Sequence, residues 1–114
     1  MDTNVREAIN QGFVRAEIAS GADKKADRVY GESTLNPVSL DRFASSAEAN
    51  YMAAISCFLR TLPRIADPRS NLLIRTEIDR LLTRLEAMRR LRALAEAALA
   101  GAGQDELDRG PVGS

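Results

Sequence analysis

The stretch from Asn71 to Ala100 is the feature that most constrains how this chain folds. It contains no glycine or proline and consists largely of leucine, alanine, arginine and glutamate, which are strong helix formers. Its large apolar residues recur at alternating spacings of four and three, which places them on one side of a helix. These residues are Ile74, Ile78, Leu81, Leu85 and Met88. The pattern predicts one long amphipathic helix whose apolar side must be covered by other helices.

A first helix is predicted near the N-terminus. Small and apolar residues between Val5 and Ala19 fall on one arc of a helix, and Gly21 is a suitable end because glycine often follows the last helical residue. We therefore expect a helix over residues 5–20. The sequence ADKKADRVY that follows is also compatible with a helix, so an alternative interpretation extends this element to Tyr30.

The second helix is predicted over residues 40–62, after a loop at residues 31–38 that contains glycine, serine, threonine and proline. Ser39 is the expected N-cap. The apolar stripe of this helix is the cleanest in the chain, and the core residues that we expect from it are Phe43, Tyr51, Ile55 and Phe58. Asp67 and Pro68 then mark the start of the long helix over residues 68–100, as N-cap and first helical residue. The short connection over residues 63–67 predicts that these two helices form an antiparallel hairpin.

The composition supports an all-α fold. Aromatic residues make up 4% of the chain, and valine and threonine are scarce, so the residues that strands prefer are few. We predict a single domain over residues 1–100, an all-α helical hairpin or three-helix bundle without strands. The N-terminal helix packs alongside the hairpin or is exchanged with a second copy. The polar, acidic residues 101–114 begin at a glycine and are expected to form a disordered tail.

Charge and cysteine content argue against several classes of function. Sixteen basic and sixteen acidic residues cancel, so no overall field attracts the chain to nucleic acid or to an anionic membrane. The chain has no histidine and a single cysteine, Cys57, so we expect no metal site and no cofactor. The N-terminal sequence is polar, and no apolar run is long enough to span a bilayer. We therefore expect a cytoplasmic protein without membrane contact.

Arg92 interrupts the apolar side of the long helix. The stripe that ends at Met88 points next toward Arg92, whereas the following apolar residues project about 100° away from it. Because burying an unpaired arginine costs several kcal/mol, we expect the first stripe to stop packing there. Beyond it we predict a second apolar surface that faces away from the hairpin. The residues of this predicted interface are Met88, Leu91, Arg92, Leu94 and Ala98.

This division of the long helix favours a non-enzymatic protein–protein interaction module. An adaptor, an assembly or secretion chaperone, and a regulatory protein all fit this description. The mechanism would be burial of helix against helix, with arginine side chains at the rim giving register and specificity. We expect the partner to be a second copy of the chain, as in a coiled-coil dimer, or a helix of another protein.

A nucleic-acid-binding regulator is the alternative. Nine arginines lie between Arg60 and Arg92 against four carboxylates, and phosphate binding requires such cations to converge on one face. Around a single helix they are spread over most of the circumference, so a dimer would have to supply the convergence. The residues that would contact nucleic acid are Arg80, Arg84, Arg89 and Arg90.

A small all-helical enzyme is the third class. Residues 75–79, RTEID, resemble the opening of helical chorismate mutases, whose members bind a dicarboxylate with basic residues from several helices. The resemblance covers only this fragment, and Leu82 stands where that pattern has an acid. No base and nucleophile pair stands out in the spacing of the remaining residues, so no catalytic residue is assigned.

Overall fold

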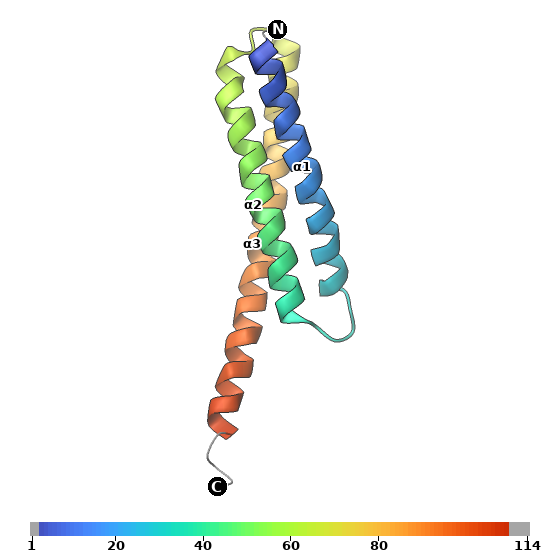
Figure 1. Ribbon diagram of the computed structural model, residues 1–114, viewed down its shortest axis with the longest axis vertical. Helices are drawn as coiled ribbons and strands as arrows, with labels where there is room; N and C mark the ends of the chain where they lie inside the picture. The colour runs from blue at the N-terminus through green and yellow to red at the C-terminus, as the bar shows by residue number, and fades with distance from the viewer. Residues whose placement is uncertain (1–2, 110–114) are drawn as a thin grey trace.

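The structure of the chain, a computed structural model, describes residues 3–109, with side chains for residues 3–101. It contains three long helices, α1 (Thr3–Tyr30), α2 (Pro37–Thr61) and α3 (Pro68–Arg109), and a short 3-10 turn, η1 (Leu62–Arg64). Figure 1 shows that α2 runs antiparallel to both α1 and α3. The described residues contain no strand, so the prediction of an all-α bundle with a long C-terminal helix is confirmed.

A seam of inward-facing residues runs along both α1 and α2, with spacings of three and four that keep it turned toward the neighbouring helices. The α1 seam consists of Val5, Ile9, Gly12, Ala16, Ala19, Asp23 and Ala26. The α2 seam consists of Leu40, Ala44, Ala47, Tyr51, Ala54 and Phe58. Many of these residues are glycine or alanine, so the backbones of α1 and α2 can approach each other closely.

The large side chains of the core come mainly from α2 and α3. Tyr51, Phe58, Leu40, Leu81 and Met88 are among its largest fully buried residues. Of the other residues that the sequence assigns to the hairpin core, all except Phe43 are buried. The buried ones are Ile55, Ile74, Ile78 and Leu85. Phe43 is only half-buried and packs at the edge of the core, where the Lys25 ammonium lies 5.7 Å from the centre of its ring.

Helix α1 is longer than residues 5–20, so the alternative interpretation that extends it to Tyr30 is correct. Gly21 lies inside the helix. A glycine in a helix interior costs about 1 kcal/mol relative to alanine, and the buried seam that continues through Ala26 and Val29 offsets this cost. The helix ends before Gly31, whose N–H still donates to the Asp27 carbonyl at 3.0 Å.

Helix α2 begins at Pro37 and not at residue 40, which shortens the predicted loop to residues 31–36. Its N-cap is Asn36, not Ser39: the Asn36 side-chain oxygen accepts a hydrogen bond from the Ser39 N–H at 3.1 Å. Proline at the first helical position fits this arrangement because it lacks an N–H to satisfy. The start of α3 matches the sequence prediction, since the Asp67 carboxylate accepts from the Ser70 N–H at 3.2 Å.

Helix α3 does not end at Ala100 but continues to Arg109. Gly101, at which the predicted tail begins, does not stop it, because a glycine costs only about 1 kcal/mol and an established helix gains a hydrogen bond with every residue added. The structure thus has residues 101–109 as part of α3, where the sequence predicts a disordered tail. Residues 110–114 of the predicted tail lie outside the described part of the chain.

The three helices end at different levels, which leaves part of α3 without neighbours. Asp23 of α1 lies beside Arg84 of α3, and the two helices run parallel, so Tyr30 at the end of α1 is level with Leu91. Beyond Leu91 only the first turns of α2 lie beside α3. Figure 1 shows α3 extending well past the loop that joins α1 to α2, in a molecule with principal extents of 71 × 23 × 18 Å.

Candidate functional site

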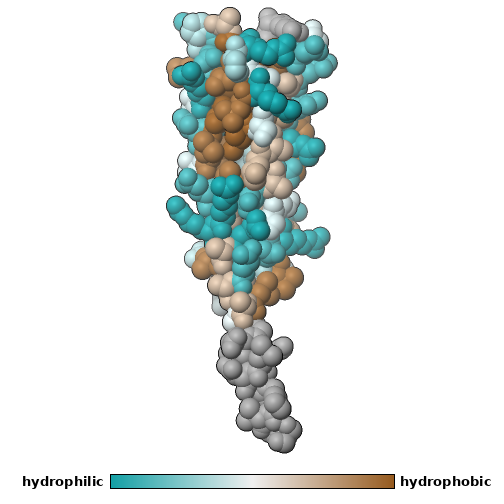
Figure 2. Space-filling view, turned by 90° about the vertical axis from the view of Figure 1, so that its left-hand side faces the viewer, coloured by the Kyte–Doolittle hydropathy of each residue, from teal (hydrophilic) through white to brown (hydrophobic). Residues whose placement is uncertain are grey.

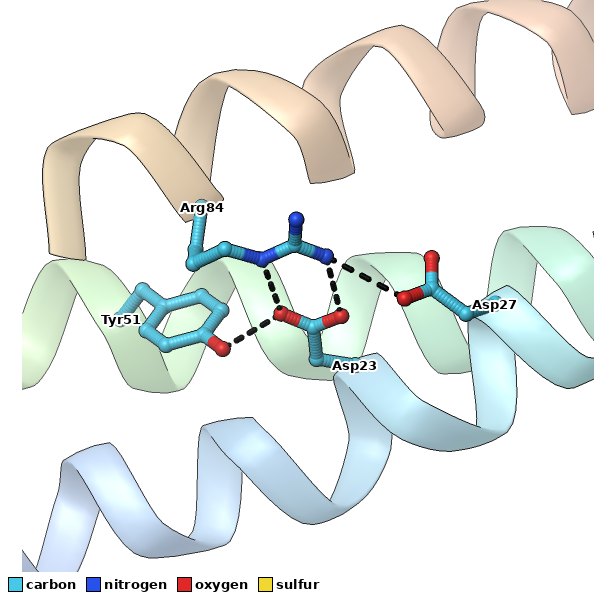
Figure 3. A network of polar contacts seen from close by, with 4 residues as sticks. All are labelled: Asp23, Asp27, Tyr51 and Arg84. Carbon is cyan, nitrogen blue, oxygen red and sulfur yellow. Dashed lines mark hydrogen bonds and ion pairs between the residues drawn. The ribbon is translucent and has the colours of Figure 1, made fainter. Parts of the chain in front are cut away.

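A network of polar side chains joins all three helices (Figure 3). Asp23 of α1 is buried. Its carboxylate accepts a 2.5 Å hydrogen bond from the Tyr51 hydroxyl of α2 and bonds of 2.8 and 2.6 Å from Nε and Nη2 of Arg84 of α3. The same Nη2 lies 3.4 Å from the carboxylate of Asp27, one helical turn further along α1. Each helix thus contributes at least one residue to the network.

The groups in this network perturb one another's titration. Burial by itself would raise the pKa of Asp23, but the hydrogen bonds from Arg84 and Tyr51 outweigh it and hold that pKa below its usual value. Burial, together with the neighbouring Asp23 carboxylate, raises the pKa of the Tyr51 hydroxyl. The hydrogen bond to Asp23 raises the pKa of Arg84 further above its already high value. At neutral pH the network is a carboxylate, a neutral phenol and a guanidinium.

The sequence did not single out this network. Asp23 lies in the charged segment ADKKADR, which is typical of a solvated helix surface, and Arg84 was assigned only to the possible nucleic-acid surface. The available signal was the seam of α1, in which Asp23 follows Ala16 and Ala19 at the core spacing. A charged residue at a seam position predicts a buried partner of opposite charge.

Arg92 does not interrupt packing, contrary to the expectation from the sequence. Its Nη1 donates to the Glu48 carboxylate of α2 at 2.7 Å, and Nε of Arg89 lies 3.6 Å from the other oxygen of the same group. Because Arg92 is paired, its neighbours remain in the core. Leu91 and Ala95 are both buried, and they continue the α3 seam for another turn beyond Met88.

The residues of the predicted interface therefore do not form one surface. Met88 is fully buried and Leu91 nearly so, both inside the chain's own bundle, so their assignment to an external interface is wrong. Leu94 is 47% exposed and Ala98 is half-buried. Arg92 is half-exposed and bound to Glu48. Of the predicted set, Leu94 is the apolar residue that is clearly accessible.

The arginines assigned to the nucleic-acid alternative are mostly bound to carboxylates of the same chain. Arg80 pairs with Glu77, Arg84 with Asp23, and Arg89 with Glu48. Arg90 is exposed and takes part in no ion pair within the described residues. These pairings lower the positive charge that α3 presents to a ligand.

Several apolar side chains remain outside the core. Figure 2 shows the largest apolar patch in the upper part of the face that it presents, and smaller ones below a broad band of hydrophilic side chains. The exposed large apolar residues of α2 and α3 are Val38, Met52, Leu59, Leu72, Leu73, Leu82, Leu94 and Leu99. On α1 the exposed apolar residues are Phe13, Val14, Ile18 and Tyr30.

Three open hollows lie between the helices. Two are lined by α1 and α2 alone, and the third, between α1 and α3, is lined by Arg6, Ile9, Phe13, Ser70, Leu73 and Ile74. Among the side chains that the structure describes, no group of three or more cysteine, aspartate or glutamate residues is placed to hold a metal ion. None of the described helices combines the length and apolar character that a bilayer span requires.

The fold and its surface define a small antiparallel bundle of three helices, held together by a buried ionic network and carrying exposed apolar side chains. No known protein family, curated protein or solved structure matches the chain. Its function must therefore be argued from its own residues.

Proposed function

We propose that the protein is a non-enzymatic interaction module that self-associates through the α3 end segment, defined as Ala93–Gly101. The mechanism is burial of this segment against a helix of a second copy. Such a module suits an adaptor, an assembly or secretion chaperone, or a regulatory protein.

The composition of the α3 end segment carries this proposal. From Ala93 to Gly103 the sequence contains a single charged residue, Glu96, although α1 ends near Leu91 and no longer covers this part of α3. A helix surrounded by water usually carries charged residues on most of its surface. Here Leu94 and Leu99 are 47% and 39% exposed, and most other residues are alanine. This surface is suited to contact with another helix.

A second copy in antiparallel orientation is the partner that best complements the segment. Alanine and glycine allow close approach of two helices, as they do between α1 and α2 of the same chain. In the sequence, Arg89 and Arg90 precede the segment, and Asp105 and Glu106 follow it. Two antiparallel segments that cross near Ala97 would bring Arg90 of each copy, which takes part in no ion pair within the described residues, level with the acidic residues of the other. Parallel segments would bring like charges together.

Light scattering coupled to size-exclusion chromatography tests the proposal. We expect the wild-type protein to elute with the mass of a dimer or a higher oligomer, and Leu94→Glu to shift it to the monomer because a carboxylate would be buried at the contact. Leu72→Glu is the matched control. Leu72 is 65% exposed, it lies near the other end of α3, and its substitution should leave the mass unchanged. A wild-type monomer at all accessible concentrations would rule out self-association.

The nucleic-acid alternative has less support. A dimer would bring additional copies of Arg90 together, but Arg80, Arg84 and Arg89 are each engaged by a carboxylate of their own chain. Titration of the protein with duplex DNA at low and high salt would distinguish the two proposals, because phosphate binding weakens steeply with salt.

A further inference from the structure

The strongest further candidate for a binding surface is the groove that α1 and α2 form between them. An open hollow of about 770 Å³ is lined by residues between Asn10 and Ile18 of α1 and between Ala53 and Arg60 of α2. A second hollow of about 310 Å³ is lined by residues between Ile18 and Lys25 of α1 and between Arg42 and Ser46 of α2. Ile18 lines both hollows, so together they form one surface, which we call the α1–α2 groove.

The lining of the α1–α2 groove includes exposed apolar side chains and several small residues, together with polar ones such as Asn10 and Gln11. Val14 and Ile18 are 55% and 48% exposed, although both are large apolar side chains. Gly21, Ala53 and Ser56 line the hollows, so a docked element could lie close to the backbone of both helices. An elongated groove of this kind, with large apolar contacts and small residues between them, suits the apolar face of an α-helix.

All the charged side chains that line the groove are positive. They are Arg15 and Arg60 in the larger hollow and Lys25 and Arg42 in the smaller one, and neither hollow is lined by a carboxylate. Glu17 belongs to the exposed surface of α1 but lines neither hollow. In a chain with equal numbers of acidic and basic residues, this local excess of positive charge defines the chemistry of a complementary partner.

These four cations lack counter-charges within the described residues. Arg15 donates to the Asn50 side-chain oxygen at 3.4 Å, and Arg60 donates to the Ser56 carbonyl at 3.3 Å. Lys25 lies over an aromatic ring. No ion pair joins any of the four to a described carboxylate, whereas four arginines of α3 are ion-paired; those four are Arg80, Arg84, Arg89 and Arg92.

We propose that the α1–α2 groove binds an amphipathic helix of a partner protein whose apolar face is flanked by glutamate or aspartate residues. The apolar face covers Val14 and Ile18, and the acidic flanks meet the cations on both sides of the groove. A nucleic acid would satisfy the cations but would leave Val14 and Ile18 uncovered, so an acidic helix fits better. This partner is distinct from the second copy that the α3 end segment binds.

Fluorescence anisotropy with a labelled helical peptide tests this proposal. The probe is a designed peptide with leucine and alanine on one face and glutamate on both flanks, and its matched control carries lysine in place of glutamate. We expect the acidic probe to bind at least about tenfold more tightly than the lysine peptide, and its binding to weaken as salt is raised. Equal binding of the two peptides would overturn the proposal.

Charge reversals locate the site. The double substitution Arg15→Glu and Arg60→Glu should weaken binding of the acidic probe about tenfold or more, because two attractions become repulsions. Arg69→Glu with Arg75→Glu makes the same change in charge on exposed residues of α3 outside the groove, and should leave affinity nearly unchanged. Circular dichroism verifies that each variant is folded. Equal losses in both double variants would contradict the assignment of the site.

Two further measurements separate this proposal from other possibilities. Leu94→Glu, which should abolish self-association, is expected to bind the acidic probe as tightly as the wild type does. A loss of peptide binding in this variant would place the peptide at the α3 end segment instead. Displacement of the probe by a short DNA duplex that binds more tightly than the probe would overturn the proposal in favour of a nucleic-acid ligand.

Discussion

At the scale of single residues, we infer that the network of Asp23, Tyr51 and Arg84 helps to set how the helices align. Each of the three helices contributes one of these residues. The buried Asp23 carboxylate of α1 depends on donors from α2 and α3. Sliding α1 by one residue would leave this carboxylate buried without partners, at a cost of several kcal/mol, and sliding α2 or α3 would remove one of its two donors. Most residues of the α1–α2 seam are small and similar to one another, so the network adds to the register that the contact between Gly12 and Phe58 supplies.

Replacing Asp23 by asparagine should reduce the free energy of unfolding by about 1–3 kcal/mol at neutral pH, because Arg84 loses its buried charged partner. The matched control is Asp27→Asn. Asp27 is exposed and lies 3.4 Å from the same guanidinium, and its substitution should cost less than about 0.5 kcal/mol. Urea denaturation of both variants provides the measurement. Equal effects of the two substitutions would contradict the role assigned to Asp23.

Tyr51 should make the protein less stable in alkali. Its pKa in the folded protein lies above the value of about 10 in an unfolded chain. Above pH 10 the unfolded state therefore releases a proton that the folded state retains, and stability falls by up to about 1.4 kcal/mol per pH unit. Tyr51→Phe has no phenol to titrate. As the pH is raised from 9 to 11, the unfolding free energy of the wild type should therefore fall relative to that of the variant. Parallel pH profiles would refute this explanation.

Most of this network could not be predicted from the sequence. Asp23 and Arg84 are separated by 61 residues, and no local pattern connects them. Arg92 and Glu48 are likewise distant in sequence, which is why an unpaired arginine was expected to end the apolar stripe. Ion pairs between helices depend on their alignment, and alignment is a property of the folded bundle.

At the scale of the helices, the contact between α1 and α2 depends on Gly12. A Cβ atom at this position would lie 2.5 Å from Cε1 of Phe58, whose ring is fully buried and packs edge-on against Phe13 at a centroid distance of 5.0 Å. The ring cannot move without disturbing this packing. Glycine at residue 12 is therefore required by close approach and not by backbone conformation, since no described glycine has a positive φ angle.

Gly12→Ala should destabilise the protein by about 1–3 kcal/mol, because overpacking against Phe58 exceeds the gain of about 1 kcal/mol in helix propensity. Gly21→Ala in the same helix is the control. No atom lies within 4 Å of a Cβ placed there, so this substitution should stabilise the protein by about 0.5–1 kcal/mol. Thermal unfolding of the two variants should shift in opposite directions. Stabilisation by both substitutions would show that the α1–α2 contact is loosely packed.

The sequence predicts the helices better than it predicts their ends. Apolar periodicity identified the three helices and most of the hairpin core, and Asp67 with Pro68 identified the start of α3. Gly21 and Gly101 were misread as stops because a local rule for glycine ignores packing and propagation, which act over many residues. Asn36 was missed as the N-cap because Ser39 offers the same chemistry three residues later.

At the scale of the whole molecule, the protein combines a three-helix bundle with two surfaces that expose apolar side chains. The α3 end segment lies beyond the end of α1, and the α1–α2 groove is lined by residues of α1 before Ala26 and of α2 after Asp41. We propose that the first binds a second copy and the second an acidic helix, which would allow one chain to hold two partners at once.

Hydrogen–deuterium exchange at low and high protein concentration tests the proposed self-association most directly, because it locates the contact as well as detecting it. We predict that backbone amides of Ala93–Gly101 exchange more slowly at high concentration, while those of the loop at residues 31–36 do not change. In Leu94→Glu, exchange in the α3 end segment should be the same at both concentrations. Exchange in wild-type Ala93–Gly101 that does not depend on concentration would contradict the proposal.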